Sequence, residues 1–470
     1  MSTEAGDGGA ARQEPGSGEG GLKRQLGLID AAAVTAGNIL GSGVFVAPAA
    51  VAAAATGFGS TAAIWILGGI IAACGAFCYA ECGTRLPHPG GFYVFYRAVY
   101  GRPVAFVGGW AALLITYPAS IAAIAIVFGQ YARELAPGAA PSASSLAAAA
   151  LVIVGLLNIV GVRAAAWAQR FLTVSKVGAL AAVCLTAVIF AGVAPQSQDR
   201  PSSPEAAAPA PDVPWTVLLG AIVVVLWTYD GWSDLSLLAG EVRDPGRVLG
   251  RAVVVGMLVL VALYIAVQMS VGALLPPGRA AASDRVVAEA VESGLGVRYA
   301  WIVALLVALT TFGSVHGVTL TSSRIGYAMA RDRTFFDWFG AVHPRFGTPA
   351  RSVALVTAAS LVYVFAAGFR NLLGFFSFSV WFFYGLTAIA LLVLRRKGIG
   401  GAGAWRAPGG LLAPAVVLLT AAGMTSSLMA EDPKRSLIGL TLLLAGFPVY
   451  AAWHLLGRLR KGAPEAGLPR

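Results

Sequence analysis

The sequence predicts an all-α membrane protein with twelve transmembrane helices. First, 57% of the 470 residues are apolar and only 12% are charged, whereas soluble domains carry about 25% charged residues. Second, apolar segments of roughly 20 residues, enough to cross a bilayer, recur along the whole chain. Third, two of these segments are interrupted by glycine and polar residues. A soluble enzyme could not cover a core of this size with so few charges.

The apolar segments follow one another at short intervals. We expect spans over residues 27–54, 60–83, 101–136, 145–162, 167–192, 215–240, 250–275, 298–330, 352–368, 372–394, 410–430 and 438–457. The third and eighth are longer than a perpendicular crossing requires, so we expect them to be tilted or to extend beyond the bilayer.

Basic residues set the orientation. With the N-terminus inside, Lys and Arg residues in the inner loops and tails outnumber those outside by about three to one. Both termini are therefore expected in the cytoplasm, with the protein in the cell's inner (plasma) membrane. This bias also accounts for the net charge of +11 without a nucleic-acid partner.

Two segments differ in composition from the spans. Residues 1–21 contain no apolar stretch typical of a signal peptide and predict a disordered cytoplasmic tail. Residues 193–214 are rich in Pro, Ala and Ser and predict a flexible external loop.

The first span carries glycines on either side of a serine. Gly41 and Gly43 flank Ser42, and Pro48 follows. Glycine in a helix costs about 1 kcal/mol relative to alanine. Taken alone, this pattern favours close packing between helices.

The sixth span decides between these readings. Its sequence Thr228-Tyr229-Asp230-Gly231-Trp232-Ser233-Asp234 places two carboxylates and a glycine in an apolar segment. Acidic residues at membrane depth are costly and mark functional sites. Interruptions in the first and sixth spans, five helices apart, indicate two five-helix repeats of opposite topology, each opening with a discontinuous helix.

An interrupted helix exposes backbone groups inside the membrane. Such groups are tolerated only where they line a cavity. N–H groups at a half-helix start suit a carboxylate, and freed carbonyls suit an ammonium group. An amino acid presents both charges on one carbon, so the architecture predicts such a substrate.

Several motifs, in order, resemble one family over nearly the whole chain. GNILGSGVFVAP and FCYAECGTRLPHPGGFYVFYRAVYG resemble the opening of the amino acid–polyamine–organocation (APC) superfamily. WTYDGWSDLSLLAGEVRDPGRVLGRA, TSSRIGYAMARDRTFFDWFGAVHPRFGTPARS and FFSFSVWFFYGLTAIALLVLRR resemble the sixth, eighth and tenth helices of its L-type amino acid transporter branch. The resemblance implies a leucine-transporter-type fold with alternating access and sodium-independent transport of neutral L-amino acids.

The resemblance also implies roles for residues at the two interruptions. The substrate carboxylate is expected at the N–H groups of Ser42 and Gly43, with Gly41 in the turn. Its ammonium group is expected at the carbonyls of Ile39, Trp227 and Asp230. Trp227 occupies the position of a gating aromatic residue, and Gly231 lies in the same unwound stretch. From their residue types, Trp227, Trp232, Trp381 and Tyr384 are expected to form an apolar and aromatic wall around the substrate side chain.

Lys176 is the one basic residue predicted inside a span. Snorkelling to the interface is the structural alternative, but nine residues, roughly 13 Å of helix, separate it from Trp167. An unpaired lysine at this depth costs about 3 kcal/mol. The resemblance implies that Lys176 replaces a sodium ion by bridging helices one and eight, as a fixed surrogate cation or a protonatable switch.

Other polar residues in the spans do not form a catalytic or metal-binding set. Cys74, Cys78 and Cys82 lie at i, i+4 and i+8 without matching His or carboxylate ligands, so we expect no metal or cofactor. His316 could relay protons, although a neutral, hydrogen-bonded histidine is the more frequent outcome. An enzyme or a nucleotide-driven pump is disfavoured because no nucleophile–base set and no GxxxxGK[ST] motif occur.

Substrate and coupling remain open at this stage. The alternative to neutral amino acids is a cationic amino acid or polyamine, because Asp230 carries a carboxylate. Transport could be exchange or symport with protons. The resemblance implies that animal members bind an ancillary subunit through a cysteine in this external loop; residues 134–146 contain no cysteine, so a disulfide-linked subunit is not expected.

The predicted organisation can be given as ranges. It comprises the tail 1–21, a first repeat 22–192, the loop 193–214, a second repeat 215–397, helices eleven and twelve in 398–457, and a cytoplasmic tail 458–470.

Overall fold

A computed structural model describes residues 21–462, with gaps at 56, 136–137, 139–140, 191–212, 367–368 and 432. Most of the expected tails 1–21 and 458–470 and of the loop 193–214 lies outside these residues. The described part is helical, with one isolated parallel bridge between Leu26 and Val242. All twelve expected spans contain helix, in agreement with the all-α prediction.

The first half of the chain contains the helices of the predicted first repeat. They are α1 (Leu28–Ile39), η1 (Ser42–Phe45), α2 (Ala47–Ala54), α3 (Phe58–Arg85), α4 (Phe92–Val99), α5 (Arg102–Ala111), η2 (Ala112–Thr116), α6 (Tyr117–Glu134), α7 (Ala143–Ile159) and α8 (Val162–Phe190).

The second half is equally helical. It contains α9 (Trp215–Thr228), η4 (Asp234–Glu241), α10 (Pro245–Leu274), α11 (Pro277–Ala282), α12 (Val286–Leu295), η5 (Val297–Tyr299), α13 (Ala300–Arg331), η6 (Asp337–Gly340), α14 (Ala350–Ala366), α15 (Phe369–Arg396), α16 (Leu412–Glu431), α17 (Pro433–Leu444) and α18 (Gly446–Gly462).

Length and composition separate these helices into two classes. Within the described residues, eight helices are long and apolar enough to cross a membrane, and four shorter apolar helices accompany them. Two of the shorter ones, α1 and α9, belong to the interrupted spans. The chain is therefore a multi-pass protein, and twelve crossings in two inverted repeats remain a prediction.

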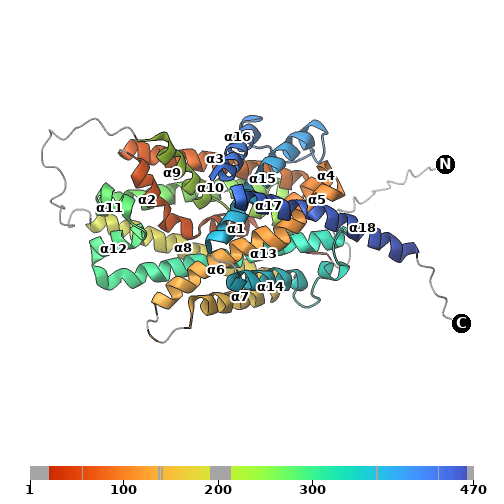
Figure 1. The fold of residues 1–470 in the computed structure, drawn as a ribbon, viewed down its shortest axis with the longest axis horizontal. Coiled ribbons are helices and arrows are strands. Elements are labelled where there is room, and N and C mark those ends of the chain that lie inside the picture. The colour runs from red at the N-terminus through yellow and green to blue at the C-terminus, as the bar shows by residue number, and fades with distance from the viewer. Residues whose placement is uncertain are drawn as a thin grey trace, which may run out of the picture.

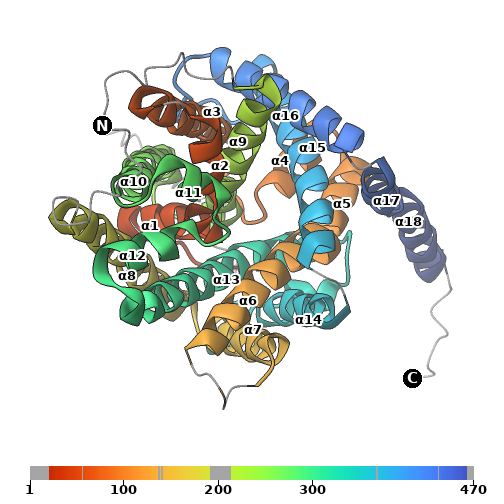
Figure 2. The ribbon, with the colours of Figure 1, turned by 60° about the vertical axis from the view of Figure 1, so that its left-hand side comes forward.

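Among the eight long apolar helices of the described residues, the most buried is α13, which runs beside α6 through the middle of the molecule (Figures 1 and 2). In α13, 78% of the apolar window is buried, against 17% in the window that joins α17 and α18. The latter two helices lie at the edge of the bundle in Figure 2. The helices α1, α6, α7, α8 and α14 pack directly against α13, whereas the window that joins α17 and α18 lies mostly at the surface of the bundle.

The α5–α6 region is not a regular α-helix. Its middle, Ala112–Thr116, forms a π-helix turn that joins α5 to α6. Such a turn inserts an extra residue into the helical repeat and often lies at functional sites.

Candidate substrate-binding site

The first interruption follows α1. This helix ends at Ile39, Leu40 leaves the helical conformation, and Gly41 is extended. The chain then makes the short helix η1 and resumes as α2, which has Pro48 in its first turn. No side chain caps η1, and the first N–H groups of a helix have no partner within it. The N–H groups of Ser42 and Gly43 are in this position.

The second interruption follows α9. This helix ends at Thr228, and Gly231 takes φ +107°, a conformation that favours glycine. The chain continues as the 3₁₀-helix η4 from Asp234. The interruptions therefore fall within the two stretches that the sequence analysis selected.

Glycines allow the two interrupted segments to touch. A Cβ atom on Gly43 would lie 2.8–3.0 Å from atoms of Thr228, including its Cα. A Cβ atom on Gly231 would lie 3.0 Å from the carbonyl oxygen of Asn38. Larger residues would therefore push the segments apart.

A tyrosine from a third helix joins the same two segments. The buried hydroxyl of Tyr264, in α10, lies 3.2 Å from the carbonyl oxygen of Ile39 and 3.2 Å from that of Thr228. The Ile39 carbonyl also accepts a hydrogen bond of 2.8 Å from the N–H of Gly41, and that of Trp227 accepts one of 3.1 Å from Asp230. These two carbonyls, assigned to the ammonium group, thus already have protein donors.

Both interruptions open onto one cavity of about 990 Å³, a volume that includes its open mouth. The lining residues come from α1, η1, α3, α4, the π turn, α6, α9 and its following turn, η4, α13 and α15. They include seven residues predicted from the sequence: Ile39, Gly41, Ser42, Gly43, Trp227, Asp230 and Gly231.

The eighth predicted residue, Trp232, lies behind the cavity wall. It is 4% exposed and does not line the cavity. Its ring packs 4.1 Å from Tyr384 and 5.3 Å from Tyr79, centroid to centroid. Of the four residues expected in the aromatic wall, Trp227 and Tyr384 line the cavity, together with Tyr79, whereas Trp232 and Trp381 do not line it and pack against Tyr384.

Lys176 is fully buried in α8 and reaches the end of α1. Its Nζ donates hydrogen bonds to the carbonyls of Gly37 (2.9 Å) and Leu40 (3.1 Å) and to the hydroxyl of Ser314 (2.9 Å) in α13. Ser314 in turn donates to the Leu40 carbonyl at 3.0 Å. An ammonium group has three donors, and all three have acceptors here. The side chain does not snorkel; it joins α1 to α13.

Comparison with known proteins identifies the family. The model of the amino acid permease family matches residues 26–435. The human large neutral amino acids transporter small subunit 2 is 31% identical over 455 residues, which cover 94% of this chain and 82% of that protein. The chain belongs to the amino acid permease family.

Other relatives agree with this assignment. The human b(0,+)-type amino acid transporter 1 is 31% identical, covering 80% of this chain and 76% of that protein. The mouse Asc-type amino acid transporter 1 is 29% identical, covering 91% and 81%. The permease therefore belongs to the APC superfamily, whose members are membrane-embedded transporters and not enzymes.

Two carboxylates of the permease face the cavity. Asp230 accepts a hydrogen bond of 2.5 Å from the hydroxyl of Tyr384. Asp234 accepts from the side-chain amide of Asn38 (2.8 Å) and from the hydroxyl of Tyr117 (2.9 Å). Neither forms an ion pair with a described Lys, Arg or His residue.

His316 is buried in α13, outside the cavity lining. Its Nε2 lies 3.0 Å from the carbonyl oxygen of Ala165, and its Nδ1 lies 3.2 Å from the side-chain amide of Asn158. A neutral ring with the proton on Nε2 satisfies both contacts. The geometry favours the structural reading of this histidine. The described residues contain no metal-binding group, and Cys74, Cys78 and Cys82 are free thiols.

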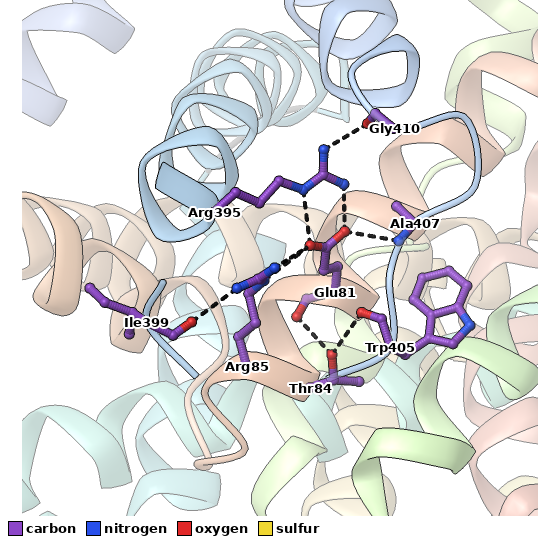
Figure 3. A network of polar contacts seen from close by, with 8 residues as sticks. All are labelled: Glu81, Thr84, Arg85, Arg395, Ile399, Trp405, Ala407 and Gly410. Carbon is purple, nitrogen blue, oxygen red and sulfur yellow. Dashed lines mark hydrogen bonds and ion pairs between the residues drawn. The ribbon is translucent and has the colours of Figure 1, made fainter. Parts of the chain in front are cut away.

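Full ion pairs occur elsewhere, around Glu81 in α3 (Figure 3). This carboxylate accepts hydrogen bonds from Nε of Arg395 (2.9 Å), Nε of Arg85 (3.0 Å) and the backbone N–H of Ala407 (2.8 Å). Arg85 also donates to the Ile399 carbonyl, and Arg395 to that of Gly410. We call this set the Glu81 network. It fastens the segment after α15 to the end of α3.

The sequence analysis missed the polar residues that come from other helices. Asn38, Thr116, Tyr117 and Ser120 line the cavity, and Tyr264 joins its two interruptions. Asn38 directly precedes Ile39, and Asp234 was noted only as a neighbour of Asp230. The run of Tyr117, Pro118 and Ser120 in an apolar span was the available signal.

Proposed function

We propose that the permease is a sodium-independent secondary transporter of neutral L-amino acids, working by alternating access, with the substrate bound between the interruptions after α1 and α9. The observation that carries this proposal is that two interrupted helices, from distant parts of the chain, face one cavity. Twelve crossings in a leucine-transporter-type fold with two inverted repeats belong to the same proposal, with both termini in the cytoplasm of a cell whose plasma membrane holds the protein.

The substrate's charged groups have candidate partners in the interrupted segments. The N–H groups of Ser42 and Gly43 are proposed to bind the carboxylate. The ammonium group is proposed to bind near the Ile39, Trp227 and Asp230 carbonyls, sharing the first two with the donors already present. The side chain then meets a mostly apolar and aromatic wall, which favours neutral substrates.

Lys176 is proposed to act as the fixed cation at the place of a sodium ion. Its contacts support this version over a protonatable switch. Two of its partners are carbonyls, which can only accept, and the third, Ser314, already donates to Leu40. Loss of the proton would leave two N–H donors for three acceptors, so one of the three would lose its hydrogen bond.

A second candidate substrate class is cationic amino acids or polyamines. The observation that favours it is the pair of cavity carboxylates, Asp230 and Asp234, without a basic residue in the lining. The names of two relatives specify large neutral amino acids, and this supports the neutral class for the permease.

The permease is also proposed to work without a disulfide-linked subunit. Relatives are named as small subunits of a transporter. In the permease, three of the four cysteines, Cys74, Cys78 and Cys82, are within α3, and Cys184 is within α8.

Counterflow in proteoliposomes tests the proposal. Vesicles preloaded with each of the twenty amino acids in turn are offered labelled leucine or alanine, without sodium, and competition by arginine and putrescine is measured. We expect accelerated uptake with several neutral amino acids, since one methylene changes selectivity by only about 1–3 kcal/mol. Inhibition by the cations with none by neutral amino acids would establish the second class.

A further inference from the structure

The loop between α13 and α14, residues 332–349, contains the short helix η6 and carries exposed aromatic side chains. Phe336 and Trp338 are 48% and 53% exposed, whereas Phe339 is buried. The ring of Phe336 also lies 4.7 Å from that of Trp453 in α18, which lies at the edge of the bundle (Figure 2). Exposed tryptophan at the end of a membrane-crossing helix is typical of the boundary between lipid and water.

Two arginines reach η6 from the two ends of this loop. Arg331 is the last residue of α13, and its Cδ would lie 3.4 Å from a Cβ atom on Gly340, at the end of η6. Arg351, in the first turn of α14, donates from Nη1 to the carbonyl of Trp338 at 3.0 Å, and its Cζ lies 5.6 Å from the centre of the Trp338 ring. Both arginines are exposed. Positive charge therefore flanks the exposed tryptophan.

A third arginine has an unfavourable backbone conformation. Arg333 takes φ +57° where α13 ends, and the N–H of Thr334 bonds back to the carbonyl of Met329 at 3.0 Å. Glycine is usual at such a helix end, because the left-handed conformation costs other residues roughly 1–2 kcal/mol. Strain of this kind indicates a role for the side chain. We call Arg331, Arg333 and Arg351 the η6 arginines.

The η6 arginines lack carboxylate partners within the part of the chain that the structure describes. Asp332 lies between two of them in sequence, but it pairs with Arg97 at 2.6 Å and lies 3.9 Å from Arg102. Asp337 in η6 is exposed and supplies one negative charge. Three guanidinium groups with one nearby carboxylate suit an anionic ligand, and phosphate matches their planar donor geometry.

We propose that the η6 arginines and Trp338 bind the headgroup of an anionic phospholipid. The lipid phosphate accepts hydrogen bonds from the guanidinium groups of Arg331 and Arg351, and Trp338 and Phe336 contact the upper part of the acyl chains. A free phosphate ion would leave both aromatic rings in water, so the combination favours a lipid. With both termini in the cytoplasm, a part of the proposal that rests on the proposed function, this lipid lies in the cytoplasmic leaflet, whose surface is negative.

Tryptophan quenching in proteoliposomes tests this binding. The full chain is reconstituted in phosphatidylcholine vesicles that contain a small fraction of lipid with brominated acyl chains, which quench nearby tryptophan fluorescence. The contribution of Trp338 is the difference between the wild type and Trp338→Phe. We expect brominated phosphatidylglycerol to quench this contribution more strongly than brominated phosphatidylcholine, and added salt should reduce the preference by screening.

The double variant Arg331→Gln/Arg351→Gln, measured with and without Trp338→Phe, should lose this preference. We expect affinity for phosphatidylglycerol to fall about five-fold for each arginine removed, which corresponds to about 1 kcal/mol. If the double variant does not insert, Arg333→Gly replaces it. This change relieves the backbone strain, so it should keep or raise the thermal unfolding midpoint while it weakens the lipid preference.

The matched control is Arg243→Gln/Arg345→Gln, which removes the same charge from two exposed arginines. Arg243 follows η4, and Arg345 lies over the ring of Phe346, 5.6 Å from its centre. Neither has a recorded contact with η6, so the lipid preference should equal that of the wild type. Inorganic phosphate should reduce the preference no more than sodium chloride of equal ionic strength.

Three results would overturn the proposal. Equal quenching by the two brominated lipids would show an interfacial tryptophan without headgroup binding. An unchanged preference in the double variant or in Arg333→Gly would place the lipid elsewhere, and specific competition by inorganic phosphate would make a free anion the ligand. The vesicles hold both lipids in both leaflets, so the test requires neither transport nor a given orientation. Counterflow on the same vesicles tests the proposed function separately, so the two failures can be distinguished.

Discussion

The cavity and the Glu81 network handle buried charge in opposite ways. In the network, one carboxylate meets two guanidinium groups and a backbone N–H, and the bond directions are fixed by groups that only donate (Figure 3). In the cavity, two carboxylates accept hydrogen bonds from neutral donors, one amide and two tyrosine hydroxyls, and a hydroxyl can also accept. The Glu81 network therefore holds two segments together with its charges fully paired, whereas the cavity carboxylates remain free to interact with a ligand.

The largest expected effect on stability is at the network. Glu81→Gln leaves Arg85 and Arg395 without a buried counter-charge, and loss of one partner from a buried pair costs about 3–5 kcal/mol. We expect a clear fall in the thermal unfolding midpoint of the purified permease. The control is Asp244→Asn, whose exposed pair with Arg247 is 3.7 Å long and contributes about 0–1 kcal/mol. Equal midpoints for the two variants would show that the network does not fasten the fold.

The next effect concerns transport. Lys176→Ala removes the ammonium group that bridges the carbonyls of Gly37 and Leu40 to Ser314, so that only the Ser314 hydroxyl still joins the end of α1 to α13 at this point. We expect exchange to fall by about tenfold or more, with a smaller loss of substrate binding, because the equilibrium between conformations shifts. Exchange rate and binding are measured on the same preparation. Lys434→Ala, at an exposed lysine, is the control. A wild-type exchange rate in Lys176→Ala would contradict its bridging role.

Gly43→Val tests the contact between the interrupted segments. Its side chain would collide with Thr228, including the Cα atom, so the segments must separate and substrate binding should be lost. Gly220→Ala in α9 is the control, since nothing lies within 4 Å of the added Cβ. Substrate-induced thermal stabilisation reports binding. Retention of wild-type affinity in Gly43→Val would place the substrate elsewhere.

The smallest effect is expected for Tyr264→Phe. Only the hydroxyl between the Ile39 and Thr228 carbonyls is removed, and one hydrogen bond contributes about 0.5–1.5 kcal/mol, a few-fold change in exchange rate. Tyr229→Phe is the matched control. Its hydroxyl contacts the Trp65 carbonyl at 3.4 Å and neither interruption. A lower exchange rate in Tyr264→Phe but not in Tyr229→Phe would show that the hydroxyl between the two interruptions contributes to transport.

Much of the fold could be predicted from sequence because each signal lay within one segment. Apolar length identified the helices, and Gly41, Gly43 and Gly231 identified where two of them stop. The cost of an unpaired buried lysine was enough to single out Lys176, since any acceptor would have to come from a neighbouring helix.

Contacts between distant segments could not be predicted in this way. The partners of Asp234 are 117 and 196 residues away in sequence, and those of Tyr264 come from α1 and α9. Aromatic residues were also difficult, because Trp232 and Tyr384 pack on each other and only Tyr384 lines the cavity, which depends on how the turn after α9 packs against α15. Apolar patterning fixes which face of a helix is buried but not its neighbour.

The π turn at Ala112–Thr116 has a consequence for how α6 could evolve. It adds one residue to the helical repeat directly before Tyr117. One residue corresponds to roughly 100° of rotation about the helix axis. Deletion of Ala112 would restore an unbroken α-helix and turn either the Tyr117 side or the α5 side of the span away from its present neighbours. Loss or gain of one residue here would therefore change which residues of the α5–α6 span face the cavity, and would alter the site more abruptly than a substitution does.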